Sequence, residues 1–292
     1  HRLVVATFKL HVKSGKMVPS QPRLDVGQLK DERAAEEFAN KLSGDLGGLG
    51  TLGDPEEFAL NLGADMLELD VRRTNDGQVV VCHDSSLLRT CGKDADIRKL
   101  NYNELPRYRS RIPVSFQPGC ECMGEDRRIP LLREVFAAFP DVSINIDIKD
   151  NDDELISQVS ELVREFRREP LTVWGNARHQ IVRKCRLENP AIPTLFSARR
   201  VLCLVAYYYS GLLPFLPIPE ACLEIPVPSM LLMEPGKLPR LNRFLLHAPC
   251  VFPQVYLWVL NEEADFKRAF DLGVTGVMTD FPSKLRQFLS AR

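Results

Sequence analysis

Two stretches, Met66-Leu-Glu-Leu-Asp-Val71 and Ile144-Asn-Ile-Asp-Ile-Lys149, decide how this chain folds. Each alternates apolar and polar residues with the period of two that is typical of a β-strand. The leucines of the first stretch share one face, and Glu68 and Asp70 share the other. A buried carboxylate is costly unless it is paired or bound to a metal. The pattern therefore predicts two strands whose polar faces meet in a site.

Around these stretches, short apolar runs alternate with amphipathic segments from residue 54 onward. The predicted strands are Met66–Val71, Val79–His83, Val142–Ile148, Leu171–Trp174, Pro193–Ser197, Val255–Leu260 and Gly276–Thr279. The predicted helices are Leu131–Phe139, Asp152–Arg167, Ala177–Leu187, Glu262–Leu272 and Pro282–Leu289. This alternation predicts an α/β fold, a parallel sheet covered by helices, and its size suits a (β/α)8 TIM-type barrel. Since only seven strands can be assigned, strand one is expected before residue 54 or is missing.

Composition excludes several classes of protein. Of 292 residues, 45% are apolar and 26% are charged, as in soluble globular proteins. The 38 basic and 39 acidic residues leave no basic surplus, which argues against a general nucleic-acid binder. The eight cysteines are scattered without a CxxC pair, so we expect reduced thiols. The first residues carry neither a signal peptide nor an apolar anchor, so the protein lacks one or the chain is a fragment.

Carboxylates from both decisive stretches predict a metal site. Glu68, Asp70 and Asp147 offer oxygen ligands, which suit Mg²⁺ or Ca²⁺. An ion-pair network is the alternative, in which Arg72 binds the first two carboxylates and Lys149 binds the third. Convergence of several such strands favours the site.

Five motifs follow one another in an order that resembles a known family. They are Glu68-Leu-Asp70, His83-Asp84, Asp147-Ile-Lys149, Trp258-Val-Leu-Asn261 and Gly273-Val-Thr-Gly-Val-Met-Thr-Asp280-Phe-Pro282. On these motifs, residues 54–292 resemble the glycerophosphodiester phosphodiesterase domain, and most of all its vertebrate membrane-associated lysophospholipase D type. Residues 1–53 are then an unmatched segment that ends in a glycine-rich connector, Gly44–Gly53.

The resemblance implies a (β/α)8 barrel and a role for each matching residue. Glu68, Asp70 and Asp147 would hold the divalent metal. His83 would be one of two catalytic histidines, which suits a side chain at a strand end. Lys149 would contact the phosphate, and Trp258 would line the pocket.

The family's other catalytic histidine belongs to a His-Arg-Gly-Gly motif without a full match in this chain. The dipeptide His1-Arg2 is either a remnant of that motif, separated by an insertion, or a chance match. His1 is therefore a candidate for the second histidine, and His11 is another. A second departure lies near Asn242–Pro253, where two prolines occupy the place of a late helix.

The expected function is metal-dependent hydrolysis of glycerophosphodiesters, in particular of lysophospholipids to lysophosphatidic acid and a head-group alcohol. The two departures leave an alternative open, a catalytically impaired relative or aberrant isoform that only binds lipid or a partner. A third reading is a product that fails to close its barrel.

An apolar stretch, Val201–Leu216, bears on membrane contact. It is shorter than the roughly 20 residues of a spanning helix, and Gly211 and Pro214 interrupt it. It is either a buried helix–loop or a lip that dips into a bilayer or lines an acyl-chain groove; lipid substrates favour the lip. We accordingly expect a membrane-surface partner and a location on the cytoplasmic face of intracellular membranes, namely the endoplasmic reticulum.

Overall fold

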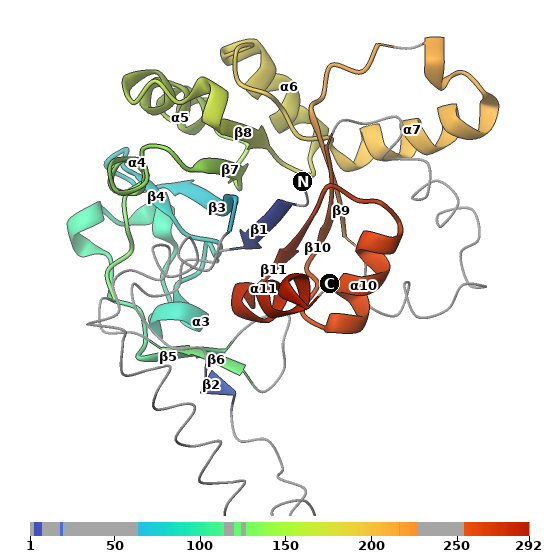
Figure 1. Ribbon diagram of the computed structural model, residues 1–292. Coiled ribbons are helices and arrows are strands. Elements are labelled where there is room, and N and C mark those ends of the chain that lie inside the picture. The colour runs from blue at the N-terminus through green and yellow to red at the C-terminus, as the bar shows by residue number, and fades with distance from the viewer. Residues whose placement is uncertain are drawn as a thin grey trace, which may run out of the picture.

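The computed structural model describes residues 3–7, 18–19, 64–113, 120–123, 127–215, 217–226 and 254–291. In this part of the chain, seven parallel strands form the central sheet (Figure 1). They are β1 (Leu3–Thr7), β3 (Met66–Arg73), β7 (Ser143–Ile148), β8 (Thr172–Gly175), β9 (Cys222–Pro226), β10 (Gln254–Trp258) and β11 (Gly276–Thr279). Their order in the sheet is β8-β7-β3-β1-β11-β10-β9.

A short extended segment joins the two ends of this sheet. Thr194 pairs in parallel with Trp174 of β8, and Leu195 pairs in parallel with Cys222 of β9. With this segment as the eighth strand, the sheet closes on itself. The predicted (β/α)8 barrel is confirmed.

The strand expected before residue 54 is β1. Its residues pair with Met66–Glu68 of β3 on one side and with Gly276–Thr279 of β11 on the other. Strand one is thus present, and Leu3–Thr7 belong to the barrel, whereas the sequence assigned them to a separate segment. Apart from Val18–Pro19 (β2), the rest of residues 1–53 lies outside the described residues, as does the altered helix expected near Asn242–Pro253.

Two further strands differ from the prediction. β4 (Val79–Val81) runs antiparallel to β3, so the run Val79–His83 is the second arm of a hairpin and not a barrel strand. The barrel strand that takes its place in the count is β9, which was not predicted. It lies in a proline-rich part of the chain, and prolines argue against a central strand.

Helices cover the outside of the barrel. They are α4 (Leu132–Ala138), α5 (Asp153–Glu165), α6 (His179–Glu188), α7 (Ala198–Ser210), α10 (Glu263–Asp271) and α11 (Pro282–Ser290). The five predicted helices are confirmed, with ends shifted by at most two residues. Local signals explain where they begin: the Asp152 carboxylate accepts from the Glu154 backbone N–H at 3.0 Å, and Pro282 opens α11.

Smaller elements lie between β4 and α4. They are α3 (Leu88–Cys91), β5 (Arg111–Pro113) and β6 (Cys120–Met123), and β6 pairs antiparallel with both β5 and β2. Single turns of 3-10 helix lie at Ile97–Lys99, Tyr102–Glu104, Glu169–Leu171 and Leu213–Phe215.

The core has one layer outside the barrel and one inside it. The apolar faces of β3 and β7 are fully buried in the outer layer, as the alternation predicted. Inside the barrel, an apolar plug is formed by Met66, Val173, Leu195, Cys222, Tyr256 and Met278. Because side chains alternate along a strand, Glu68 and Glu224 follow this plug on the same inner face.

Arg168 fixes the start of β7. Its side chain is buried, and it donates to the carbonyl oxygens of Phe139 at 2.6 Å, of Pro140 at 2.7 Å and of Val142. The guanidinium also lies over the Phe136 ring, 4.8 Å from its centroid. These contacts hold the turn that leads into β7, the strand that carries Asp147.

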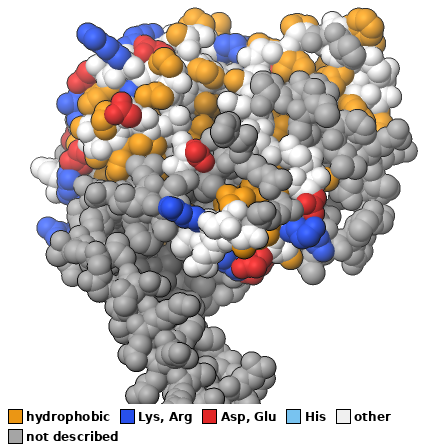
Figure 2. Space-filling model, viewed as in Figure 1, with side chains coloured by type: hydrophobic (Ala, Val, Ile, Leu, Met, Phe, Trp, Pro, Cys, Tyr) orange, Lys and Arg blue, Asp and Glu red, His pale blue; other side chains and the backbone are white. Residues whose placement is uncertain are grey.

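The described part of the apolar stretch, residues 201–215, forms most of α7 and the turn after it. Its exposed hydrophobic side chains are Leu202, Tyr209, Leu212 and Phe215, with 72%, 43%, 51% and 81% exposure. Figure 2 shows hydrophobic side chains gathered over α7 at the upper right. The chain leaves α7 and re-enters the sheet at Cys222, the amino end of β9, so the turn at Leu213–Phe215 lies at the amino ends of the strands. It does not line a groove at their carboxyl ends. No helix in the described ranges is long and apolar enough to cross a membrane.

Candidate active site

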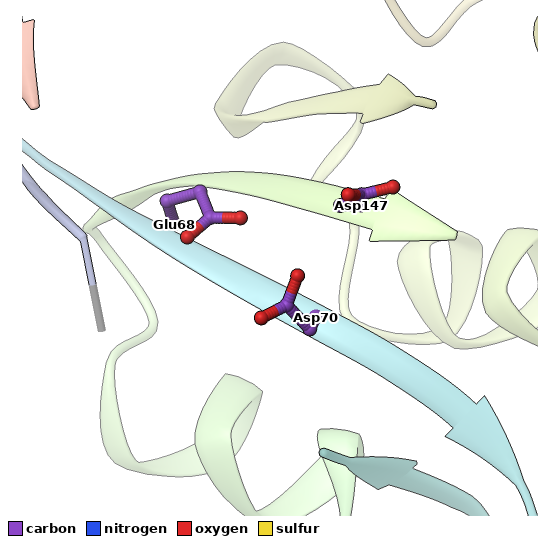
Figure 3. Close-up of side chains that lie close together, drawn as sticks. All are labelled: Glu68, Asp70 and Asp147. Carbon is purple, nitrogen blue, oxygen red and sulfur yellow. The ribbon is translucent and has the colours of Figure 1, made fainter. Parts of the chain in front are cut away.

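Three carboxylates meet inside the barrel, as the sequence predicted. Asp70 of β3 and Asp147 of β7 are direct partners in the strand register, and Glu68 precedes Asp70 by two residues on the same inner face. One carboxylate oxygen from each residue lies within 4.8 Å of those of the other two (Figure 3). Asp70 is buried, while Glu68 and Asp147 keep partial exposure.

Lys149 joins two of these carboxylates. Its Nζ lies 2.7 Å from Asp70 Oδ1 and 2.5 Å from Asp147 Oδ2. Asp147 also accepts a hydrogen bond from the side-chain amide of Asn176. The pair between Asp147 and Lys149 was part of the alternative ion-pair network, but Arg72 does not complete that network. Arg72 instead binds both oxygens of Asp150 at 2.8 Å.

The cluster carries more negative charge than Lys149 offsets. Burial, and after it the neighbouring charge of Asp70, raise the pKa of Glu68 well above its usual value. The second oxygen of Asp70, Oδ2, is buried and finds no hydrogen-bond partner among the described residues. A buried acceptor without a partner is unfavourable, and a cation would satisfy it. The all-oxygen donor set therefore fits a hard divalent cation.

His83 reaches the level of this cluster by way of the hairpin. The Cys82 backbone N–H donates to the Asp70 carbonyl at 2.8 Å, which sets the following residue beside the polar end of β3. Arg72 Nε also donates to the His83 carbonyl at 3.0 Å. The sequence predicted this placement for the wrong reason, because it took Val79–His83 for a barrel strand.

An acid and an arginine hold the His83 ring. Nδ1 of His83 lies 2.6 Å from Asp84 Oδ1, and Arg89 Nε donates to Asp84 Oδ2 at 2.6 Å. Burial alone would raise the pKa of Asp84, but the hydrogen bonds from His83 and Arg89 outweigh it and hold this pKa well below its usual range. Asp84 is thus a carboxylate at neutral pH. The same three residues line an open groove together with Arg72, Ser85, Ser86 and Leu88.

Two motif residues near the chain end support the fold of the site. Asn261 Oδ1 accepts from the Thr279 hydroxyl at 3.1 Å and from the Asp280 backbone at 3.0 Å. Its amide donates back to Asp280 Oδ2 at 3.0 Å. These bonds tie together the segments that follow β10 and β11. Trp258, at the end of β10, packs on the apolar plug and is partly exposed.

Glu224 is the acidic residue that the sequence analysis missed. It lies on the inner face of β9, and its Oε1 accepts from Asn145 Nδ2 at 2.6 Å. Burial, and after it the charge of Asp147, raise the pKa of Glu224 to about 8. The run Cys222-Leu-Glu-Ile-Pro226 alternates as the decisive stretches do, and this alternation is the signal that could have revealed it.

The predicted second histidine lies outside the described residues. The nearest described residue, Leu3, pairs with Gly276 at the amino end of β11, and it is Thr7 that pairs with Glu68. β1 thus ends at the level of the carboxylates. The assignment of His1 stays a prediction.

Comparisons with known proteins decide the family. The model of the glycerophosphoryl diester phosphodiesterase family matches residues 57–284. The chain belongs to this family. Members are phosphoric diester hydrolases that depend on a divalent metal, and the cluster of Glu68, Asp70 and Asp147 could hold that ion.

Relatives agree with this membership, and solved structures share the fold. The chain is 47% identical over 304 residues to a human protein named lysophospholipase D GDPD1, with 97% of each chain covered. It is 36% identical to human lysophospholipase D GDPD3, over 77% of this chain and 76% of that relative. A putative family member from Silicibacter pomeroyi shares the fold with a TM-score of 0.63 at 18% identity, over 99% and 94% of the two chains. A phosphodiesterase from Oleispira antarctica, solved with its product sn-glycerol-3-phosphate, has a TM-score of 0.55 at 18% identity over 79% and 87%.

Proposed function

We propose that this chain hydrolyses glycerophosphodiesters with the help of Mg²⁺ or Ca²⁺, and that its substrates are lysophospholipids. The products would be lysophosphatidic acid and a head-group alcohol. The observation that carries the proposal is the meeting of three carboxylates and Lys149 inside the barrel of a family phosphodiesterase. The names of the lysophospholipase D relatives, and the glycerol phosphate bound to a structural neighbour, support this substrate class.

Lys149 and a cation held by the carboxylates would bind the phosphodiester. A divalent cation held by Glu68, Asp70 and Asp147 would offset the negative charge of the phosphate oxygens. Burial alone would lower the pKa of Lys149, but the charges of Asp70 and Asp147 outweigh it and raise this pKa above its usual value. The ammonium group of Lys149 therefore stays charged. Lys149 would therefore donate to a phosphate oxygen while both carboxylates hold it in place.

His83 would move the proton. Its Nδ1 is bound to Asp84, which leaves Nε2 as the ring nitrogen that exchanges a proton with the substrate. Asp84 would stabilise the imidazolium form and hold the ring. β1 begins at the end of the sheet away from the carboxylates and ends with Thr7 beside Glu68. Of the two candidates for the partner histidine, we therefore favour His11, which follows β1 in the sequence, over His1, which precedes it. Trp258 would line the pocket on the side of β10.

Release of choline from lysophosphatidylcholine tests the proposal. The wild-type chain should release choline only with added Mg²⁺ or Ca²⁺, and His83→Ala should lose at least about a hundredfold in kcat. His179→Ala is a matched control, because His179 lies on α6 and its ring contacts the Ser197 hydroxyl at 3.2 Å, with no acid bound to it among the described residues. Absence of choline release from folded protein with bound metal would favour an impaired relative that only binds lipid.

We further propose that the chain works at the cytoplasmic face of the endoplasmic reticulum and contacts the membrane through the exposed side chains of α7 and the turn after it. Leu212 and Phe215 are the outermost apolar groups of this turn. Because the turn lies at the amino ends of the strands, contact there would leave the opposite end of the barrel open to substrate. Leu212→Ser/Phe215→Ser should reduce co-flotation with phosphatidylcholine vesicles, whereas unchanged flotation would refute this contact.

A further inference from the structure

A second polar group lies inside the barrel beside the carboxylate cluster. Asn145 of β7 is the register partner of Glu68, and its amide donates to Glu224 Oε1 on β9 at 2.6 Å. β7 and β9 are not neighbours in the sheet, because β8 and the segment at Thr194 and Leu195 separate them. The hydrogen bond therefore spans the barrel interior, from the wall that carries Glu68 to the wall opposite.

This group has unused hydrogen-bonding capacity. Asn145 is 1% exposed, and its Oδ1 has no hydrogen-bond partner among the described residues. The hydroxyl of Tyr256, the register partner of Glu224 on β10, is likewise buried and without a partner there. In the described part of the chain, the contacts of Glu224 run through Oε1, which also receives the Cys222 thiol at 3.7 Å. Buried polar atoms normally find partners, so the unpartnered Oδ1 of Asn145, whose amide already binds Glu224, points to a ligand.

The position and chemistry of the group define that ligand. Glu224 keeps partial exposure, as Glu68 does, and both residues lie on the inner face of the barrel. The carboxyl group of Glu224 offers hydrogen-bond acceptors, and the Asn145 amide offers a donor and the unpartnered acceptor Oδ1. Such a pair of groups can hydrogen-bond a hydroxyl group of a ligand.

We propose that Glu224, with Asn145 and Tyr256, determines specificity by binding a hydroxyl group of the substrate's glycerol moiety while the phosphate lies at the carboxylate cluster. This inference rests on the proposed function, because it requires a glycerophosphate group at that cluster. It adds that the opposite wall of the barrel distinguishes a glycerol phosphate from a bare phosphate.

Calorimetric titration of the full chain tests the proposal without relying on turnover. The ligands are sn-glycerol 3-phosphate and inorganic phosphate, each titrated in the presence of saturating Mg²⁺. The wild-type chain should bind glycerol phosphate more tightly than phosphate. Glu224→Ala should reduce this preference by about tenfold, with phosphate affinity unchanged, since a site built for a hydroxyl loses its hydrogen bonds.

A conservative variant separates binding from folding. Glu224→Gln keeps a donor and an acceptor in nearly the same shape, so it should retain most of the preference even if Glu224→Ala does not fold. The inference would be overturned if Glu224→Ala kept the wild-type preference for glycerol phosphate over phosphate. It would also be overturned if Glu224→Gln lost this preference as fully as Glu224→Ala does. If neither ligand binds the wild-type chain, the proposed function itself fails, and the inference fails with it.

Discussion

Replacement of Asp70 by asparagine tests the metal site through one buried oxygen. Asp70 contributes Oδ1 to Lys149 at 2.7 Å and leaves Oδ2 buried without a partner among the described residues. The substitution Asp70→Asn would keep the shape of the side chain but remove one of three carboxylate charges. Without metal, the variant loses part of an ion pair, yet Lys149 keeps Asp147 and the repulsion on Glu68 falls. We therefore expect a change of only about 1 kcal/mol in the free energy of unfolding without metal.

With metal, the two proteins should differ clearly. At a cation concentration about 100 times the wild-type Kd, binding stabilises the wild type by about 2.7 kcal/mol. For a chain of this size, that corresponds to a rise in Tm of roughly 5 °C or more. A hundredfold loss of affinity in Asp70→Asn would leave only about 0.4 kcal/mol, which is a rise near 1 °C.

Thermal unfolding with and without Mg²⁺ or Ca²⁺ measures this difference. Asp153→Asn is the matched control, because the Asp153 side chain is 80% exposed at the start of α5, and its variant should keep the full metal-dependent rise. The reasoning is refuted if Asp70→Asn shows the same rise as the wild type, since the cation would then bind elsewhere.

Three further predictions follow from single contacts. Asp84→Asn should lower kcat by about ten- to a hundredfold without a matching rise in KM, because His83 loses the carboxylate bound to its Nδ1. Steady-state kinetics measures both constants, and a change in KM alone would contradict this prediction. Glu224 has a pKa of about 8 in the folded chain against 4.5 ordinarily, so folding takes up a proton and the wild type loses stability as the pH rises from 4.5 to 8. In urea unfolding, the free energy of unfolding of Glu224→Gln should therefore rise relative to that of the wild type across this window, by up to a few kcal/mol. A difference that stays constant with pH would refute this prediction. Arg168→Met should lower the free energy of unfolding by about 3–5 kcal/mol, because three backbone carbonyls lose their donor. The control Arg164→Met changes a side chain that is 50% exposed and should lower it by less than about 1 kcal/mol. Equal losses in the two variants would contradict the role of Arg168.

Most of the barrel could be predicted because its strands and helices carry strong periodicity. The alternation in Met66–Val71 and in residues 144–149 placed three carboxylates on inner faces, and the structure brings those oxygens together. Local signals failed where pairing partners decide the outcome. β1 was not assigned to any residues, because nothing in Leu3–Thr7 indicates that this segment pairs with a strand that begins only at residue 66. β9 was missed because the surrounding prolines outweighed its short alternation.

The missed parts of the site follow from the same limits. Glu224 could not be assigned once its strand was missed, and its contact with Asn145 crosses the barrel. The bond between Asp84 and Arg89 depends on the turn after β4, which no periodicity describes. His83 was placed correctly because its hairpin folds back onto β3, a geometry that the apolar run alone did not reveal.

The central claim is that Glu68, Asp70 and Asp147 hold the divalent cation on which hydrolysis depends. Anomalous diffraction from crystals of the full chain soaked with Mn²⁺, an ion that accepts the same oxygen ligands, tests it most directly. One strong peak is expected, bounded by oxygens of these three side chains at roughly 2.0–2.6 Å from each. A cation bound elsewhere in the barrel, or no peak there in crystals whose dissolved protein still hydrolyses lysophosphatidylcholine with Mn²⁺, would contradict it.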